Sequence, residues 1–262
     1  MRKFLSIIGL FLSLTACTNQ VSNSTNSDLV VFAASSLTNA YMELADRFEA
    51  QNPDVTVSLN FASSSQLAAQ IIEGAQADIF ASANQTQMEK LVDAGLVTGQ
   101  PQTFAANQLT LLVPKDNSAH IQSLADLANP GITLILAAPA TPIRVYSDDI
   151  IQNYNGEEYA EAVYANLASE EANVRQVVTK IALGEGDAGF AYTSDLTPDI
   201  AEYVLNIPIP TEYNLIANYP IVIMNNSQNQ DTAAQFIAFT LSAEGQAILT
   251  KWGFISAETA DD

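Results

Sequence analysis

The fold is decided by two similar stretches of sequence, Ala33-Ala34-Ser35-Ser36-Leu37 and Phe61-Ala62-Ser63-Ser64-Ser65. Each stretch follows an apolar segment typical of a strand, residues 29–32 or 55–59. Each also precedes a segment whose apolar residues recur at helical spacing. Two consecutive units of strand, serine-rich turn and helix predict an α/β fold with mostly parallel sheets.

The two serine turns also indicate a binding site. At such a turn the first N–H groups of the helix lack backbone partners, the hydroxyls add donors, and the helix dipole is positive. Two turns of this kind in neighbouring units predict a shared site for an anion. The alternative is that each serine only caps its helix, as serine commonly does. Spacing alone does not separate the two interpretations.

The first residues resemble a bacterial lipoprotein leader. A basic start, Arg2-Lys3, precedes an apolar run over 4–14 that is too short to span a membrane. Leu14-Thr15-Ala16-Cys17 then resembles a lipobox, which predicts cleavage before Cys17 and acylation of that residue. The alternative is an ordinary secretory signal with an incidental cysteine.

These features divide the N-terminal region into a signal peptide, 1–16, and a lipidated cysteine with a flexible tether, 17–27, rich in Ser, Thr and Asn. Cys17 is the only cysteine, which excludes an internal disulfide. The expected location is extracytoplasmic, with the lipid anchor as the only membrane contact.

The acidic composition limits the kinds of molecule that the protein is expected to bind. The chain has 262 residues and a formal net charge of −20, so nucleic acid and anionic lipid surfaces are poor partners. The length suits two domains.

The usual sets of catalytic residues are absent from the sequence. The only histidine, His120, lies in a polar loop, so no Ser-His pair accompanies a nucleophile. There is no His/Cys cluster for a metal and no glycine-rich phosphate loop. We therefore expect neither an enzyme nor a cofactor. The alternative from another class is a secreted hydrolase that uses a serine of one of the turns.

Beyond the serine turns, strands and helices continue to alternate. The pattern predicts strands over 77–83, 109–113, 132–138, 187–192 and 203–207. It predicts helices over 88–94, 124–128, 147–153, 157–167, 174–181, 232–241 and 245–252, with Asn173 as the cap before Val174.

At this point the chain resembles the molybdate-binding proteins of bacterial ABC importers, which are two-lobed periplasmic binding proteins. The resemblance covers residues 28 to the end. It is carried by Val31-Phe32-Ala33-Ala34-Ser35-Ser36-Leu37-Thr38-Asn39-Ala40, Phe61-Ala62-Ser63-Ser64-Ser65-Gln66-Leu67, Gly74 to Ala83, Asn173-Val174-Arg175 and Gly189-Phe190-Ala191-Tyr192-Thr193-Ser194-Asp195.

The resemblance implies a type II binding-protein fold with the ligand in a cleft between two lobes. Lobe I would comprise 28–104 and 212–262, and lobe II 105–211, each a mostly parallel sheet flanked by helices. The function implied is capture of molybdate or tungstate outside the cell for an ABC permease by a monomer. Molybdenum would enter only as the oxyanion, without direct metal ligands. Rival interpretations are a binder of another oxyanion such as sulfate, and a sensing lipoprotein with no transport role.

Carried over residue by residue, the resemblance implies a set of uncharged donors. They are the hydroxyl and N–H groups of Ser36 and Ser64, the N–H groups of Ile143 and Val174, and the Tyr192 hydroxyl. Ser36, Ser64 and Val174 also stand at predicted helix starts, which agrees with the analysis of the turns. The alternative for Tyr192 is an ordinary, partly buried tyrosine.

One stretch departs from the family pattern. Pro142-Ile143-Arg144 stands where the family usually has a glycine in the third position, so the loop is expected to differ. Arg144 is either a solvent-facing residue that pairs with Asp148, or an additional ligand that brings a cation to the anion.

Overall fold

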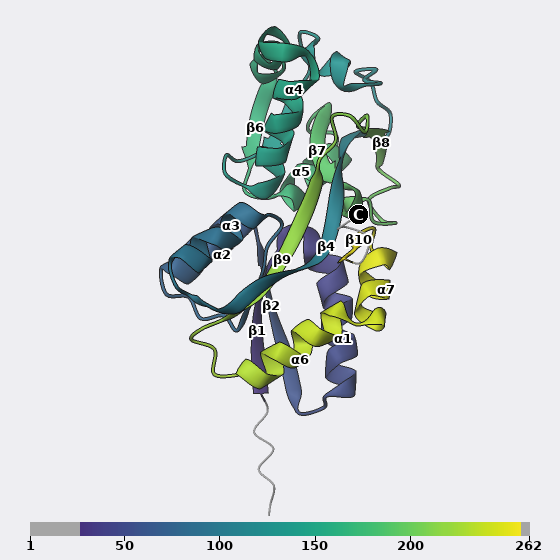
Figure 1. Ribbon diagram of the computed structural model, residues 1–262. Coiled ribbons are helices and arrows are strands. Elements are labelled where there is room, and N and C mark those ends of the chain that lie inside the picture. Colours follow the sequence, from purple (N-terminus) through teal and green to yellow (C-terminus); the bar gives the residue numbers. More distant parts are fainter. Residues whose placement is uncertain (1–26, 258–262) are drawn as a thin grey trace, which may run out of the picture.

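The computed structural model of the protein describes residues 27–257, arranged as two groups of helices and strands joined by long strands (Figure 1). The predicted signal peptide and Cys17 lie outside these residues. Ser27, at the end of the predicted tether, is already the first residue of a strand and pairs with Val55. Within residues 27–257, no helix is long and apolar enough to cross a membrane.

The first sheet has the strand order β2-β1-β3-β9-β4, with β10 paired to β4. Its strands are β1 (Ser27–Ala34), β2 (Val55–Ala62), β3 (Ile79–Ala81), β4 (Val97–Pro114), β9 (Ile216–Met224) and β10 (Ile255–Ser256). β1, β2 and β3 are parallel, and β9 is antiparallel to both β3 and β4. Its helices are the 3₁₀ turn η1 (Ser35–Leu37), α1 (Thr38–Gln51), α2 (Ser64–Ile72), α3 (Gln85–Asp93), α6 (Gln230–Leu241) and α7 (Ala243–Lys251).

The second sheet is built in the same way. Its strands are β5 (Leu134–Ala137), β6 (Leu167–Glu171), β7 (Ala188–Tyr192) and β8 (Val204–Pro208), together with the second half of β4. β5 lies parallel to β6 and β7, whereas β7 and β8 are antiparallel to β4. Its helices are η2 (Leu124–Ala128), α4 (Pro142–Ala165), α5 (Val174–Ala182) and η3 (Thr193–Asp195). Each lobe therefore combines a parallel set of strands with antiparallel crossing strands.

The crossing strand β4 belongs to both sheets. Residues 97–108 pair with β9, and Leu109–Leu112 pairs with β7. The sequence predicted only 109–113 as strand, because much of the first half of β4 is exposed and polar and carries no apolar pattern. The predicted lobe boundary at 104/105 falls inside β4, and that at 211/212 falls between β8 and β9.

The core of the first lobe follows from the alternation of side chains along β1. Leu29, Val31 and Ala33 join the apolar cluster that contains the buried face of α1. Phe32, on the other face of the strand, joins a second cluster with α2 and α3. Because successive strand residues point to opposite faces, one strand anchors helices on both sides of the sheet.

The region after β5 differs most from the predicted elements. α4 begins at Pro142 rather than at 147, since proline is well suited to the first position of a helix. The backbone is non-helical at Asn155 and Gly156, which separates the two predicted helices within this segment. β6 had not been predicted, because its alternation of exposed and buried residues over Leu167–Glu171 carries few apolar side chains.

Candidate functional site

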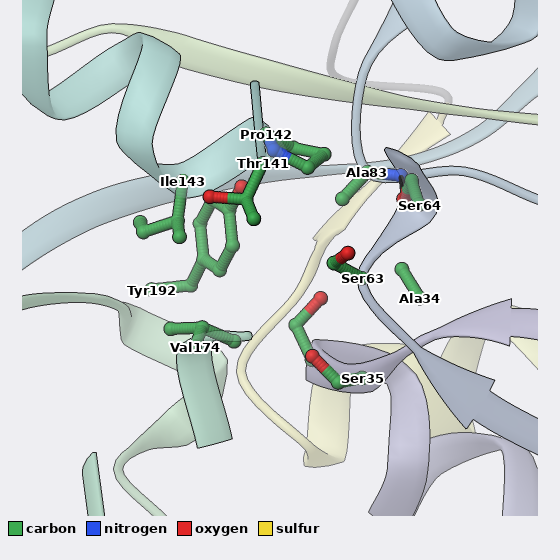
Figure 2. A pocket seen from close by; sticks show the side chains of 11 residues that line it. Ala34, Ser35, Ser63, Ser64, Ala83, Thr141, Pro142, Ile143, Val174 and Tyr192 are labelled. Atoms are coloured by element: carbon green, nitrogen blue, oxygen red, sulfur yellow. Dashed lines mark hydrogen bonds between the residues drawn. The ribbon is translucent and has the colours of Figure 1, made fainter. Parts of the chain in front are cut away.

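A small pocket lies between the two lobes, at the ends of β1, β2 and β7 and the starts of α2, α4 and α5 (Figure 2). The space in it that no atom fills, part of which is open to solvent, is about 220 Å³, and its lining contains no charged residue. Lobe I contributes Ala34, Ser35, Ser36, Ser63, Ser64 and Ala83, and lobe II contributes Thr141, Pro142, Ile143, Val174 and Tyr192. The structure thus brings Ser36, Ser64, Ile143, Val174 and Tyr192 around one pocket.

Ser63 and Ser64 have different tasks at the start of α2. The Ser63 hydroxyl caps the helix by accepting the N–H of Gln66 at 3.2 Å. The Ser64 hydroxyl instead accepts the buried N–H of Ala83 at 2.9 Å. Because a hydroxyl has one proton besides its lone pairs, the Ser64 proton remains available for a ligand. Capping therefore accounts for Ser63 and not for Ser64.

Ser36 is not a cap either. η1 and α1 both begin without a side-chain cap, and the Ser36 hydroxyl lies 2.9 Å from the hydroxyl of Tyr219. Burial raises the pKa of Tyr219, so this phenol stays protonated. When Tyr219 donates to Ser36, the Ser36 proton is free to donate in turn.

The main-chain donors of lobe II lie in the first turns of α4 and α5. The first N–H groups of a helix have no acceptor within the helix. Thr141 provides no side-chain cap for α4, and Asn173 accepts only the N–H of Gln176, at 3.2 Å, in α5. No capping side chain therefore accepts the N–H groups of Ile143 and Val174. Both lie at helix N-termini, where the helix dipole is positive, and both residues line the same pocket.

Tyr192 ends β7 with its side chain fully buried. Its hydroxyl has no hydrogen-bond partner within residues 27–257. Burial is the main cause, and the neighbouring Tyr219 the second, that raises the pKa of Tyr192 well above its usual value. The hydroxyl therefore stays protonated and can donate a hydrogen bond. An unpaired buried hydroxyl costs free energy, and an acceptor in the pocket would recover it.

Tyr192→Phe should consequently separate binding from stability. We expect anion affinity to fall by about 1.5–3 kcal/mol, the contribution of a charge-assisted hydrogen bond. Without ligand, the unfolding free energy should stay the same or rise, because an unsatisfied hydroxyl is removed. Calorimetric titration and thermal unfolding measure the two effects. A less stable variant with unchanged affinity would show that the hydroxyl is structural.

Arg144 does not line the pocket. Its Nε donates to Asp148 Oδ1 at 2.7 Å, and its Nη1 donates to Glu170 Oε1 at 2.5 Å and to the Ala137 carbonyl at 3.1 Å. In the structure the Arg144 guanidinium thus pairs with Asp148 and stands outside the pocket lining. Residue 144 lies within α4 and has helical backbone, so an arginine fits there without strain where the family usually has glycine. The residue with left-handed backbone in this loop is Ala140, with φ 66°.

Arg144→Gln should therefore change molybdate affinity less than tenfold and leave selectivity over sulfate unaltered. The substitution keeps a long polar stem and removes the charge, and the ion pairs it breaks are partly exposed and worth at most about 1 kcal/mol each. Titrations of the variant with both anions test this. A larger loss, or a reversed preference, would mean that the guanidinium turns inward when the anion binds.

Two residues of the pocket lining, and Arg175 beside it, have no role predicted from the sequence. Thr141 was missed, although a threonine before a proline is a common start of a helix. Ser35 lines the pocket beside Ser36. Arg175 lay inside a quoted motif, but its contacts come from distant segments and had no signal in the sequence.

The chemistry available in the pocket is hydrogen-bond donation. Its lining holds no imidazole or carboxylate that could act as a general base for a serine, and His120 lies exposed elsewhere. Residues 27–257 contain no group of three or more His, Cys, Asp or Glu side chains arranged to hold a metal ion. Neutral donors at helix starts suit an anion.

The chain is similar to known binding proteins over most of its length. The molybdate-binding protein ModA of Mycobacterium tuberculosis is 36% identical over 226 residues, covering 86% of this chain and 84% of the relative. The periplasmic molybdate-binding protein of Azotobacter vinelandii superposes with a TM-score of 0.75 at 23% identity, covering 87% of this chain and 98% of that one. The sulfate-binding protein SubI of M. tuberculosis superposes with a TM-score of 0.79 at 18% identity, covering 89% and 88%. These two superpositions establish the fold.

The family model for bacterial extracellular solute-binding proteins matches residues 29–255. That family consists of binding proteins rather than enzymes, so the hydrolase alternative is wrong. The chain belongs to the bacterial extracellular solute-binding proteins, in the family of the molybdate-binding proteins.

Proposed function

We propose that the protein captures molybdate or tungstate outside the cytoplasm and delivers it to the permease of an ABC importer. The observation that carries the proposal is the convergence of uncharged donors on one buried pocket, with the unpaired Tyr192 hydroxyl among them. The 36% identity to a molybdate-binding protein supports the choice of ligand.

The donor set favours an unprotonated tetrahedral dianion. Main-chain N–H groups cannot accept a proton, so a protonated phosphate would leave its O–H without a partner and lose affinity. Sulfate is also an unprotonated dianion, but it is smaller, and in a pocket sized for molybdate it would reach fewer donors at once. We therefore expect molybdate and tungstate to bind more tightly than sulfate, and phosphate to bind least.

A calorimetric titration with these four anions at one pH and ionic strength tests the proposal. Saturable binding of molybdate or tungstate to one site per chain supports it. No binding of either anion would contradict it, and a preference for sulfate would assign the site to a different oxyanion.

We further propose that Cys17 carries the lipid anchor and that the mature protein acts as a monomer without a cofactor. An anchored monomer can hand its ligand to a permease in the same membrane. Labelling of the full-length protein with a radioactive fatty acid tests the anchor, with Cys17→Ser as the control that should remain unlabelled and be released.

A further inference from the structure

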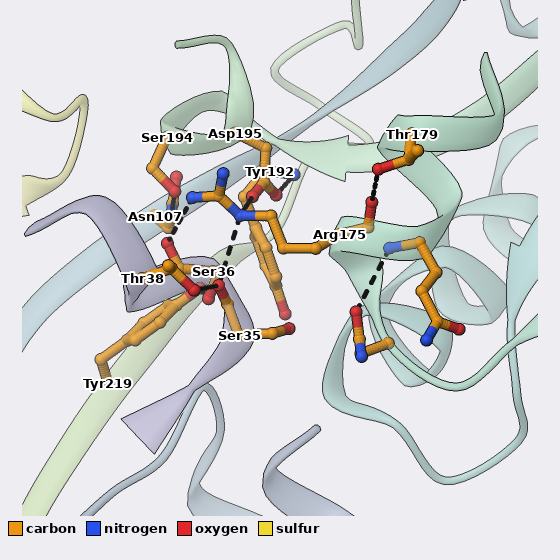
Figure 3. A network of polar contacts seen from close by, with 12 residues as sticks. Ser35, Ser36, Thr38, Asn107, Arg175, Thr179, Tyr192, Ser194, Asp195 and Tyr219 are labelled. Atoms are coloured by element: carbon orange, nitrogen blue, oxygen red, sulfur yellow. Dashed lines mark hydrogen bonds and ion pairs between the residues drawn. The ribbon is translucent and has the colours of Figure 1, made fainter. Parts of the chain in front are cut away.

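Arg175, the second residue of α5, reaches from lobe II to the first serine turn of lobe I (Figure 3). Its Nε donates to the Ser35 carbonyl at 3.3 Å, and its Nη2 donates to the Ser36 carbonyl at 3.5 Å. Both acceptors belong to η1, the first serine turn. The guanidinium thus comes from the lobe opposite the serine turn, and it touches main-chain carbonyls without lining the pocket.

The Ser35 carbonyl shares its peptide group with the N–H of Ser36, one of the proposed donors. In a planar trans peptide the carbonyl and the N–H point in opposite directions. A cation on the carbonyl side therefore polarises the N–H on the other side and strengthens its bond to an anion. The guanidinium would act on the anion through one peptide group, without contact.

Asp195, a residue of η3, forms an ion pair with Arg175. One carboxylate oxygen lies 3.0 Å from Arg175 Nε, and the other accepts the N–H of Tyr192 at 3.1 Å. The Asp195 side chain is fully buried, whereas that of Arg175 is 24% exposed. The charges of Arg175 and Asp195 cancel, so the region beside the pocket has no net charge, while the guanidinium faces the first serine turn.

We propose that Arg175 is a positioning residue that couples closure of the lobes to oxyanion binding. When the lobes meet, its guanidinium locks the main chain of the first serine turn with the Ser36 N–H toward the ligand. The closed form is thereby stabilised most when an anion occupies the pocket. This inference rests on the proposed function, since it concerns affinity for the same ligand.

The test compares wild type with Arg175→Gln and Arg175→Lys in titrations with molybdate. We expect Arg175→Gln to bind at least tenfold more weakly, mainly through faster dissociation, because a charge-assisted contact of the closed form is lost. Arg175→Lys should be intermediate, since it keeps the charge but not the two-pronged geometry. Arg144→Gln, which removes another ion-paired arginine of lobe II, is the matched control and should lose less than tenfold in affinity.

A double variant separates positioning from folding. Arg175→Gln leaves Asp195 buried without its partner, which by itself destabilises the fold. Arg175→Gln combined with Asp195→Asn removes that charge, so the melting temperature should recover while the affinity does not. Small-angle scattering should also show a smaller ligand-induced contraction for both variants than for wild type.

Two results would overturn the inference while wild type binds molybdate. One is affinity within twofold of wild type for Arg175→Gln, and the other is full recovery of affinity in the double variant. Failure of wild type itself to bind would instead contradict the proposed function, so the two failures are distinguishable.

Discussion

Ser36→Ala and Ser64→Ala should each weaken molybdate binding by about 1–3 kcal/mol, which is roughly five- to 150-fold in Kd. Each substitution removes a hydroxyl donor from a buried dianion. The Ser64 variant should also unfold more easily by about 1–3 kcal/mol, because the buried N–H of Ala83 loses its acceptor. Calorimetric titration gives the affinities, and chemical unfolding without ligand gives the stabilities.

Ser63→Ala is the matched control for this pair. Ser63 also lines the pocket, but its hydroxyl caps α2 and bonds the side chains of Ser65 and Gln66. Its removal should cost about 0.5–2 kcal/mol of stability and change affinity little. A greater loss of affinity for Ser63→Ala than for Ser64→Ala would mean that the donor at this turn has been assigned to the wrong serine.

Molybdate should stabilise the folded protein in proportion to its affinity. At a free concentration of about 100 times Kd, mass action adds roughly 2.7 kcal/mol to the unfolding free energy. For a chain of this size, that raises Tm by about 5–10 °C. A thermal scan across micromolar to millimolar molybdate and tungstate measures the shift.

The controls are sodium chloride at matched ionic strength and the Tyr192→Phe variant. Salt alone screens the self-repulsion of a chain with a net charge of −20, so sodium chloride measures that part of the shift, and molybdate should raise Tm beyond it. The variant should need a higher molybdate concentration for the same shift. A constant Tm in molybdate and tungstate up to millimolar concentration would contradict the proposed function.

The elements that the sequence predicted well are those with a strong local pattern. The units around the two serine turns and the helix of α5, with Asn173 as its cap, form as expected because their apolar spacing and caps are local properties. The start of β4 and all of β6 were missed, because exposed or alternating polar strands form only when a partner strand provides hydrogen bonds. β9 was also missed, because Pro220 interrupts its apolar run.

The sequence by itself determined the presence of two donor-rich turns and the order of most strands and helices, without β6, β9 and β10, since these features follow from neighbouring residues. Only the tertiary structure decided that Ser63 caps α2 while the Ser64 hydroxyl keeps its proton for the pocket, because that depends on the distant N–H of Ala83. It also decided that Arg144 turns to Asp148 and Glu170 while Arg175 reaches the first turn. A long charged side chain can reach many acceptors, and its partner is chosen by which segments the fold brings near, which no local pattern records.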